Sequence, residues 1–159
     1  MTSLHLSDSI VIAATPEEVY DLVSDVTRTG EWSPQCRACW WLDGGTGAVG
    51  DVFGGRQETP ERTWETRSVV EEADRARTFA WSVNDRKVLW RYDLEAVEGG
   101  TRLTESWEFP DAGQQFMAEK YGADAVREIS TRQEAARTGI PATLAAIKQV
   151  VERGAVSQN

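Results

Sequence analysis

The stretch TRLTESWEF, Thr101–Phe109, decides the fold because it reads as a β-strand with two unlike faces. Successive side chains of a strand point to opposite sides. One face is polar and consists of Arg102, Thr104, Ser106 and Glu108. The other face is apolar except for one carboxylate, and it consists of Leu103, Glu105, Trp107 and Phe109. The strand therefore raises the question of what Glu105 meets on the apolar side.

Other strand-like runs precede this one along the chain. Leu4–Ile12 alternates as a first strand, and from Cys36 onward turn signals separate about six runs, a pattern that indicates an antiparallel meander. These turn signals are Gly44-Gly45, Thr59-Pro60, Ala73-Asp74, Asn84-Asp85 and Gly99-Gly100. We therefore expect about seven strands in one sheet.

Two regions have helical signals. Thr15-Pro16-Glu17-Glu18 predicts a helix start with a capping box, and a short helix or turn is expected before Trp32-Ser33-Pro34. After Pro110 the chain has no strand signal, and apolar residues recur at helical spacing up to Val151. Gly139 and Pro141 predict a kink or short break in this long helix. A hinge there would let the helix act as a lid.

Composition bounds the class of protein. The 159 residues fit one domain, expected over 1–154 with a loose tail at 155–159. A net charge of -9 argues against nucleic acid and anionic membranes as partners. The sequence also has no apolar run long enough for stable membrane insertion and no signal-peptide pattern, so a cytoplasmic location is expected.

Seven tryptophans in a chain of this size require a place for wide apolar surface. Alternation along each strand puts most of these aromatic rings on one sheet face, each strand adding at most a few polar groups. Such a mixture is typical of a ligand pocket, although the same rings also fit a plain core. The expected ligand-binding residues are Trp41, Phe53, Gln57, Trp64, Thr66, Ser68, Trp81, Trp90, Tyr92, Glu105 and Trp107.

The segments ATPEEVYDLVSDV, EWSPQC, WWLDGG, VGDVFGGRQ, RTFAWSV, LWRYDLE and GGTRLTESWEF occur in an order that resembles the START-like helix-grip (SRPBCC) superfamily. Within it, the sequence is similar to the bacterial polyketide cyclase/dehydrase and lipid-transport branch. This resemblance implies an α+β helix-grip fold: a curved antiparallel sheet of about seven strands wrapped around a long C-terminal helix, with two short helices between strands 1 and 2. It also implies a cavity for a hydrophobic or amphipathic molecule.

The expected function is binding of a lipid, polyketide or isoprenoid, as a carrier or sequestering protein. The alternative is a polyketide cyclase or dehydratase-like enzyme with Glu105 and Tyr92 as acid and base groups. A weaker alternative is a protein-interaction module. Glu105 itself has a plain structural interpretation, an ion pair with Arg127, Arg132 or another cation of the last helix.

The remaining motifs are interpreted as structural. Cys36 and Cys39 form a CxxC spacing, but in a regular strand these positions face opposite sides, so two reduced and mostly buried thiols are expected. His5 has no nucleophile motif around it, and no metal site or cofactor is expected. The glycine-rich run at Gly44–Gly47 lacks the ending of a phosphate loop and is expected to be a hairpin or loop. A homodimer is possible.

Overall fold

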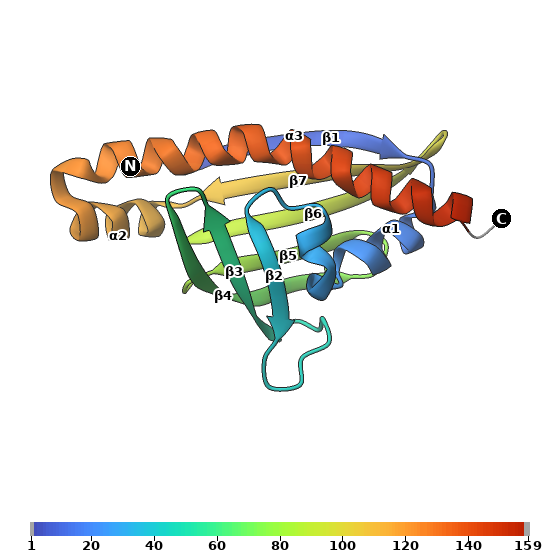
Figure 1. The fold of residues 1–159 in the computed structure, drawn as a ribbon, viewed down its shortest axis with the longest axis horizontal. Coiled ribbons are helices and arrows are strands. Elements are labelled where there is room, and N and C mark those ends of the chain that lie inside the picture. Colours follow the sequence, from blue (N-terminus) through green and yellow to red (C-terminus); the bar gives the residue numbers. More distant parts are fainter. Residues whose placement is uncertain (1, 158–159) are drawn as a thin grey trace.

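The computed structural model describes residues 2–157, of which 155–157 are described by their backbone alone. The chain forms a single sheet and a set of helices (Figure 1). The strands are β1 (Leu4–Ile12), β2 (Cys36–Trp41), β3 (Val52–Thr59), β4 (Arg62–Asp74), β5 (Thr78–Val83), β6 (Val88–Val97) and β7 (Gly100–Phe109). The helices are α1 (Pro16–Val23), η1 (Val26–Glu31), α2 (Asp111–Tyr121), η2 (Gly122–Asp124) and α3 (Ala125–Ser157).

All seven strands belong to one antiparallel sheet with the spatial order β1-β7-β6-β5-β4-β3-β2. Strands β2 to β7 follow one another as a meander, which confirms the expected succession of strands, although Ala73-Asp74 ends β4 and the turn that follows it lies at 75–77. The first strand pairs with the last, Leu6 opposite Trp107. Strands β1 and β2, which lie at the two edges of the sheet, are joined by the two short helices α1 and η1. The expected helix-grip architecture is confirmed.

Helix α1 begins where its sequence predicts. The Thr15 hydroxyl accepts a hydrogen bond from the Glu18 backbone N–H at 3.2 Å, and the Glu18 carboxylate accepts one from the Thr15 N–H at 3.3 Å. Pro16 occupies the first turn, where its missing N–H costs nothing. The buried residues of α1 are Val19, Tyr20, Leu22 and Val23.

The C-terminal helix differs from its prediction in two ways. Helix α3 runs as one helix through Gly139 and Pro141 to Ser157, so the expected short break is wrong, whereas the alternative of a kink stays a prediction. Pro141 lies on the exposed side of α3, where the free carbonyl of the preceding turn can reach water. The chain turns instead at Gly122, whose φ of 54° separates α2 from α3.

The expected tail also starts too early, because residues 155–157 continue α3. Residues 158 and 159 lie outside the described part of the chain.

Helix α3 lies along β1 and β7 and packs on them, as Figure 1 shows. The residues between these layers are almost fully buried and aliphatic. They include Ile12, Leu103, Leu144 and Ile147, each at most 1% exposed. This is the part of the molecule with a conventional apolar core.

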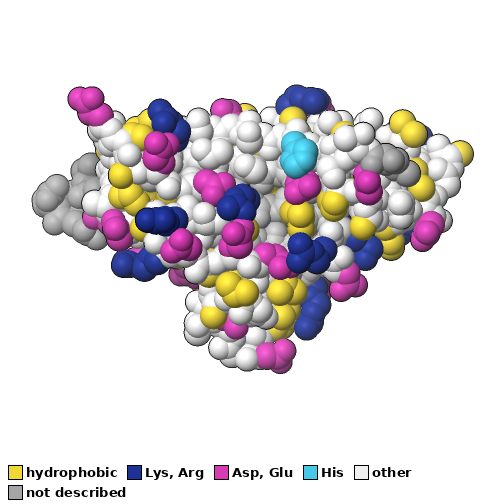
Figure 2. All heavy atoms as spheres, turned by 180° about the vertical axis from the view of Figure 1, so that it is seen from behind, with side chains coloured by type: hydrophobic (Ala, Val, Ile, Leu, Met, Phe, Trp, Pro, Cys, Tyr) yellow, Lys and Arg dark blue, Asp and Glu magenta, His cyan; other side chains and the backbone are white. Residues whose placement is uncertain are grey.

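The back of the molecule carries acidic and basic side chains mixed together, as Figure 2 shows. The outer face of β6 and β7 supplies several of them in ion pairs, including Arg91 with Asp93 and Arg102 with Glu95. Such exposed pairs add little stability but keep this face polar. Within residues 2–157, no helix combines the length and the apolar character that crossing a membrane requires.

Candidate functional site

The inner face of the sheet has the composition that the strand alternation predicts. Cross-strand partners bring together Phe53 and Ser68, then Trp81 and Trp90, then Tyr92 and Glu105. Because directly opposed residues of an antiparallel pair lie on the same face, these partners all belong to one surface. A bulge between Val70 and Glu72 resets the alternation in β4 without removing Val70 from that surface.

Aromatic rings contact one another across this face. The Trp81 ring stacks against Trp90 with centroids 6.3 Å apart and an angle of 15° between the planes. Trp81 also lies against Phe53, Phe79 and Tyr92 at centroid distances from 5.5 to 6.4 Å. Trp41 meets Phe53 edge to face at 5.6 Å. The inner face is therefore one connected aromatic surface.

Burial of the predicted ligand-binding residues changes along this surface. Five of them are buried: Phe53, Ser68, Tyr92, Glu105 and Trp107. The other six are only partly buried: Trp41, Gln57, Trp64, Thr66, Trp81 and Trp90. The structure thus brings all eleven onto the inner face and divides them into a deep group of five, on β3, β4, β6 and β7, and a partly open group of six, on β2 to β6.

Glu105 belongs to the deep group and is 4% exposed. Its Oε1 is buried and has no hydrogen-bond partner among the described residues. Burial raises the pKa of this carboxyl to about 8, an effect that hydrogen bonding from Tyr92 partly offsets. At neutral pH the side chain is therefore mainly the neutral acid, which both donates and accepts hydrogen bonds.

The ion pair considered for Glu105 is wrong. Arg127 pairs instead with Asp124, and Arg132 pairs with Glu128 at 3.0 Å. Both partners lie three or four residues away on the same part of the chain, where helical geometry favours such pairs. In the described part of the chain no cation pairs with Glu105.

Tyr92 lies directly opposite Glu105 on β6 and is 3% exposed. Burial, followed by the nearby Glu105 carboxyl, raises the pKa of the phenol well above its usual value. Hydrogen bonding from the Trp32 indole acts in the opposite direction. Tyr92 therefore stays a neutral hydroxyl that accepts a hydrogen bond from Trp32 and donates its single hydrogen bond to Glu105.

Trp32 is a member of this group that sequence reasoning missed. It follows η1, is 4% exposed and joins the same buried cluster as Tyr92. Strand alternation, which identified the other members, says nothing about a residue in a connecting segment. The only available signal was the aromatic side chain next to Ser33-Pro34.

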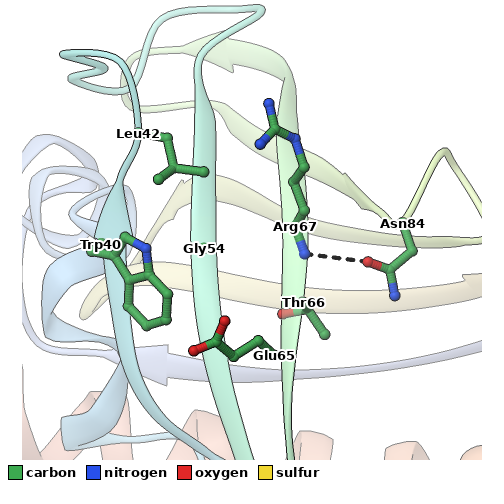
Figure 3. A pocket seen from close by; sticks show the side chains of 7 residues that line it. All are labelled: Trp40, Leu42, Gly54, Glu65, Thr66, Arg67 and Asn84. Atoms are coloured by element: carbon green, nitrogen blue, oxygen red, sulfur yellow. Dashed lines mark hydrogen bonds between the residues drawn. The ribbon is translucent and has the colours of Figure 1, made fainter.

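A hollow of about 330 Å³ lies on the opposite, outer face of the sheet, as Figure 3 shows. Trp40 packs over Gly54 on one side of it, and Arg67 lies on the other, where its backbone N–H donates to the Asn84 side chain at 3.2 Å. The hollow opens to solvent and is lined by both charged and apolar groups. It has none of the connected aromatic wall of the inner face.

The motifs interpreted as structural are placed as follows. His5 is exposed on β1, 3.7 Å from the Glu108 carboxylate. The glycine-rich segment is a loop, in which the Asp51 carboxylate accepts hydrogen bonds from the backbone of Thr46, Gly47 and Ala48. Three donated hydrogen bonds lower the pKa of Asp51 and occupy the loop's N–H groups. Among the described residues, no three His, Cys, Asp or Glu side chains gather as metal ligands.

The structure contradicts one part of the prediction for the CxxC pair, the placement of the two side chains. The two cysteines do not face opposite sides, because β2 carries a bulge between Cys36 and Ala38. Their Sγ atoms lie 3.2 Å apart. Cys36 is buried and Cys39 is partly buried, and both are free thiols.

The sequence model of the family described as polyketide cyclase / dehydrase and lipid transport matches residues 3–138. The chain belongs to this family. Among solved structures, it is similar to the polyketide cyclase-like protein Cgl2372 from Corynebacterium glutamicum, with 54% identity, coverage of 95% of this chain and 93% of that one, and a TM-score of 0.71. No curated protein matches the sequence.

Two more distant structures share the fold. The di-domain ARO/CYC StfQ from the steffimycin biosynthetic pathway is 12% identical, with 97% of this chain and 52% of StfQ covered and a TM-score of 0.73. The Zhui aromatase/cyclase from Streptomyces sp. R1128 is 21% identical, with 95% and 94% covered and a TM-score of 0.69. At these identities the likeness shows the fold alone.

Proposed function

We propose that the protein binds a hydrophobic or amphipathic small molecule of the lipid, polyketide or isoprenoid type against the inner face of the sheet. The observation that carries this proposal is the buried Glu105 Oε1, which has no partner among the described residues, on a surface made mostly of aromatic rings. A buried polar atom without a partner costs about 1–3 kcal/mol, which a ligand hydroxyl or carbonyl recovers by hydrogen bonding.

The partly open tryptophans support the same proposal. Trp64, Trp81 and Trp90 expose part of their rings on the inner face, and a flat apolar ligand would cover them. Apolar walls with a few polar groups are the usual composition of a small-molecule site. A ligand spanning both groups would rest its apolar body on these rings and direct its oxygen toward Glu105 and Tyr92.

The binding test is a tryptophan fluorescence titration with fatty acids and polycyclic aromatic compounds, with and without a hydroxyl or carbonyl group. Glu105→Gln is compared with Glu95→Gln, which changes an exposed carboxylate on the outer face of β6. We expect the first variant to weaken oxygenated ligands about tenfold and the second to leave them unchanged. If no compound class alters the fluorescence or the melting temperature of the native protein, the binding proposal fails.

An enzymatic function is the second candidate. It is favoured by the pKa of about 8 at Glu105, because a general acid or base works best when its pKa is near the working pH. The neutral Tyr92 hydroxyl opposite it would turn its single hydrogen bond from Glu105 to a substrate carbonyl, while Glu105 moves a proton at the adjacent carbon.

Turnover of an aromatic polyketide-type substrate by the native protein tests this candidate. Glu105→Gln and Tyr92→Phe are expected to abolish turnover while leaving the circular dichroism spectrum unchanged. Equal turnover by the native protein and both variants would exclude these two residues as acid and base.

A further inference from the structure

The two cysteines of β2 share one face because of the bulge in that strand. Cys36 pairs with Gln57 of β3, whereas Ala38 pairs with Arg56, so one extra residue is inserted at Arg37. In a regular strand, positions i and i+3 point to opposite sides. One inserted residue reverses that relation, as bulges do when they redirect a side chain.

The backbone around the bulge is closely packed. Gly30 of η1 lies so near the Arg37 carbonyl that a Cβ at this position would be 2.5 Å from its oxygen. Helix η1 is thus held directly against the inserted residue. Cys39, two residues beyond it, lies opposite Gly55 on the inner face.

The thiols are close enough to react with one another. Their Sγ atoms are 3.2 Å apart, and a disulfide bond is about 2.05 Å long, so a movement of about 1 Å is needed. Cys36 is 6% exposed and Cys39 is more open, so only a small oxidant reaches the pair.

We propose that Cys36 and Cys39 form a reversible disulfide with a small hydroperoxide as the oxidant. The Cys36 sulfur attacks one peroxide oxygen, the O–O bond breaks, and a sulfenic acid and one water or alcohol form. The Cys39 sulfur then attacks the sulfenic sulfur, the S–O bond breaks, and the thiol proton leaves with the hydroxide as water. Together the two thiols lose two protons and two electrons, and the peroxide accepts both pairs to become water and an alcohol, or two waters.

The surroundings distinguish the roles of the two thiols. The hydrogen bond from Cys39 lowers the pKa of the Cys36 thiol, while the same contact and burial raise the pKa of Cys39. Cys36 is therefore the thiol that ionises more readily of the two and attacks first. Cys39 is the resolving partner, and a dithiol reductant reverses the reaction by exchange.

The test uses the reduced protein of 159 residues, treated with hydrogen peroxide and then labelled under denaturing conditions with N-ethylmaleimide. We expect an intact mass two hydrogens lighter with no label, and two labels after dithiothreitol treatment. A protein that keeps both labels, gains oxygen on separate cysteines or forms only disulfide-linked dimers would overturn the proposal.

Single substitutions test the assigned roles. In Cys39→Ser the attacking sulfur remains without its resolving partner, so dimedone is expected to trap a sulfenic acid at Cys36. In Cys36→Ser we expect at least a tenfold slower reaction with peroxide. Equal rates in the two variants would overturn the role assignment, and if either variant fails to fold, the masses of the native protein decide the proposal alone.

Discussion

The two halves of the inner face differ in what covers them. On β1 and β7, helix α3 buries aliphatic side chains such as Leu103 and Leu144 almost completely. On β4 to β6, the inner face also carries Trp64, Trp81 and Trp90, which keep part of their surface open beside buried residues such as Phe79. The first half stabilises the fold, and we propose that the second half binds a ligand. Glu105 lies on β7, where the two meet.

The largest expected effect is in the packed half. Leu144→Ala removes a side chain that is 1% exposed and leaves a cavity beneath α3. We expect the free energy of unfolding to fall by about 2–5 kcal/mol, measured by urea unfolding. The folded fraction should keep the ligand affinity of the native protein. A much smaller loss of stability would mean that α3 packs loosely, and the contrast between the halves would disappear.

The next largest effect concerns Glu105 and depends on pH. Its pKa is about 8 in the folded protein and near its ordinary value of 4.5 when unfolded. Between these values the folded state holds one more proton than the unfolded state, so stability falls as pH rises, by about 1.4 kcal/mol per pH unit at most.

Glu105→Gln removes this dependence. We expect it to raise the free energy of unfolding by a few kcal/mol at pH 8 and to change it little at pH 4.5. Urea unfolding at several pH values measures the difference, with Glu95→Gln as the control. If the difference in unfolding free energy between the native protein and Glu105→Gln were the same at pH 4.5 and at pH 8, the carboxyl would have a partner or lie in contact with water.

A smaller gain is expected from Pro141→Ala in the packed half. Proline in the interior of a helix removes one backbone hydrogen bond and costs up to about 3 kcal/mol relative to alanine. Because Pro141 is exposed within the continuous α3, we expect a gain of about 1–3 kcal/mol in the free energy of unfolding.

Pro60→Ala, in the turn between β3 and β4, is the control for this helical effect and should bring no such gain. Unchanged ligand association rates in Pro141→Ala would agree with a helix that does not open at this point. Slower ligand association in this variant would support the expected role of the helix as a lid over the ligand site.

The smallest stability effect is expected in the open half. Trp64 is partly exposed and its ring is covered by Arg62, with 4.1 Å between the guanidinium carbon and the ring centroid. We expect Trp64→Ala to cost about 1 kcal/mol in stability but to weaken ligand binding about tenfold. Trp40→Ala, on the outer face, is the control and should leave ligand affinity unchanged. Equal loss of affinity in both variants would contradict an inner-face site.

Features that depend on neighbours in the chain could be predicted from the sequence. The capping box of Thr15 and Glu18 involves residues three apart, and the alternation around Glu105 follows from strand geometry alone. The pairs Arg127–Asp124 and Arg132–Glu128 follow the same local logic. Their spacing could have indicated nearer partners for these arginines, although we considered both as partners of Glu105.

Features that depend on packing between distant segments could not be predicted in this way. The bulge at Arg37 exists only in the pairing of β2 with β3, so spacing alone put the two cysteines on opposite faces. Pro141 stays helical because packing of Ile140 and Leu144 outweighs its local preference. The contact of Trp32 with Tyr92 joins two residues that lie far apart in the sequence, one just before β2 and the other on β6.

The bulge in β2 also bears on self-association. Strands β1 and β2 form the two edges of the sheet, and an edge with regular unpaired backbone groups invites another chain to add a strand. At β2 the inserted Arg37 interrupts that regular array, and η1 lies against it. At β1 the Lys148 ammonium of α3 donates to the Val11 carbonyl at 2.8 Å. The same irregularity that brings two thiols together thus discourages strand-by-strand aggregation at that edge.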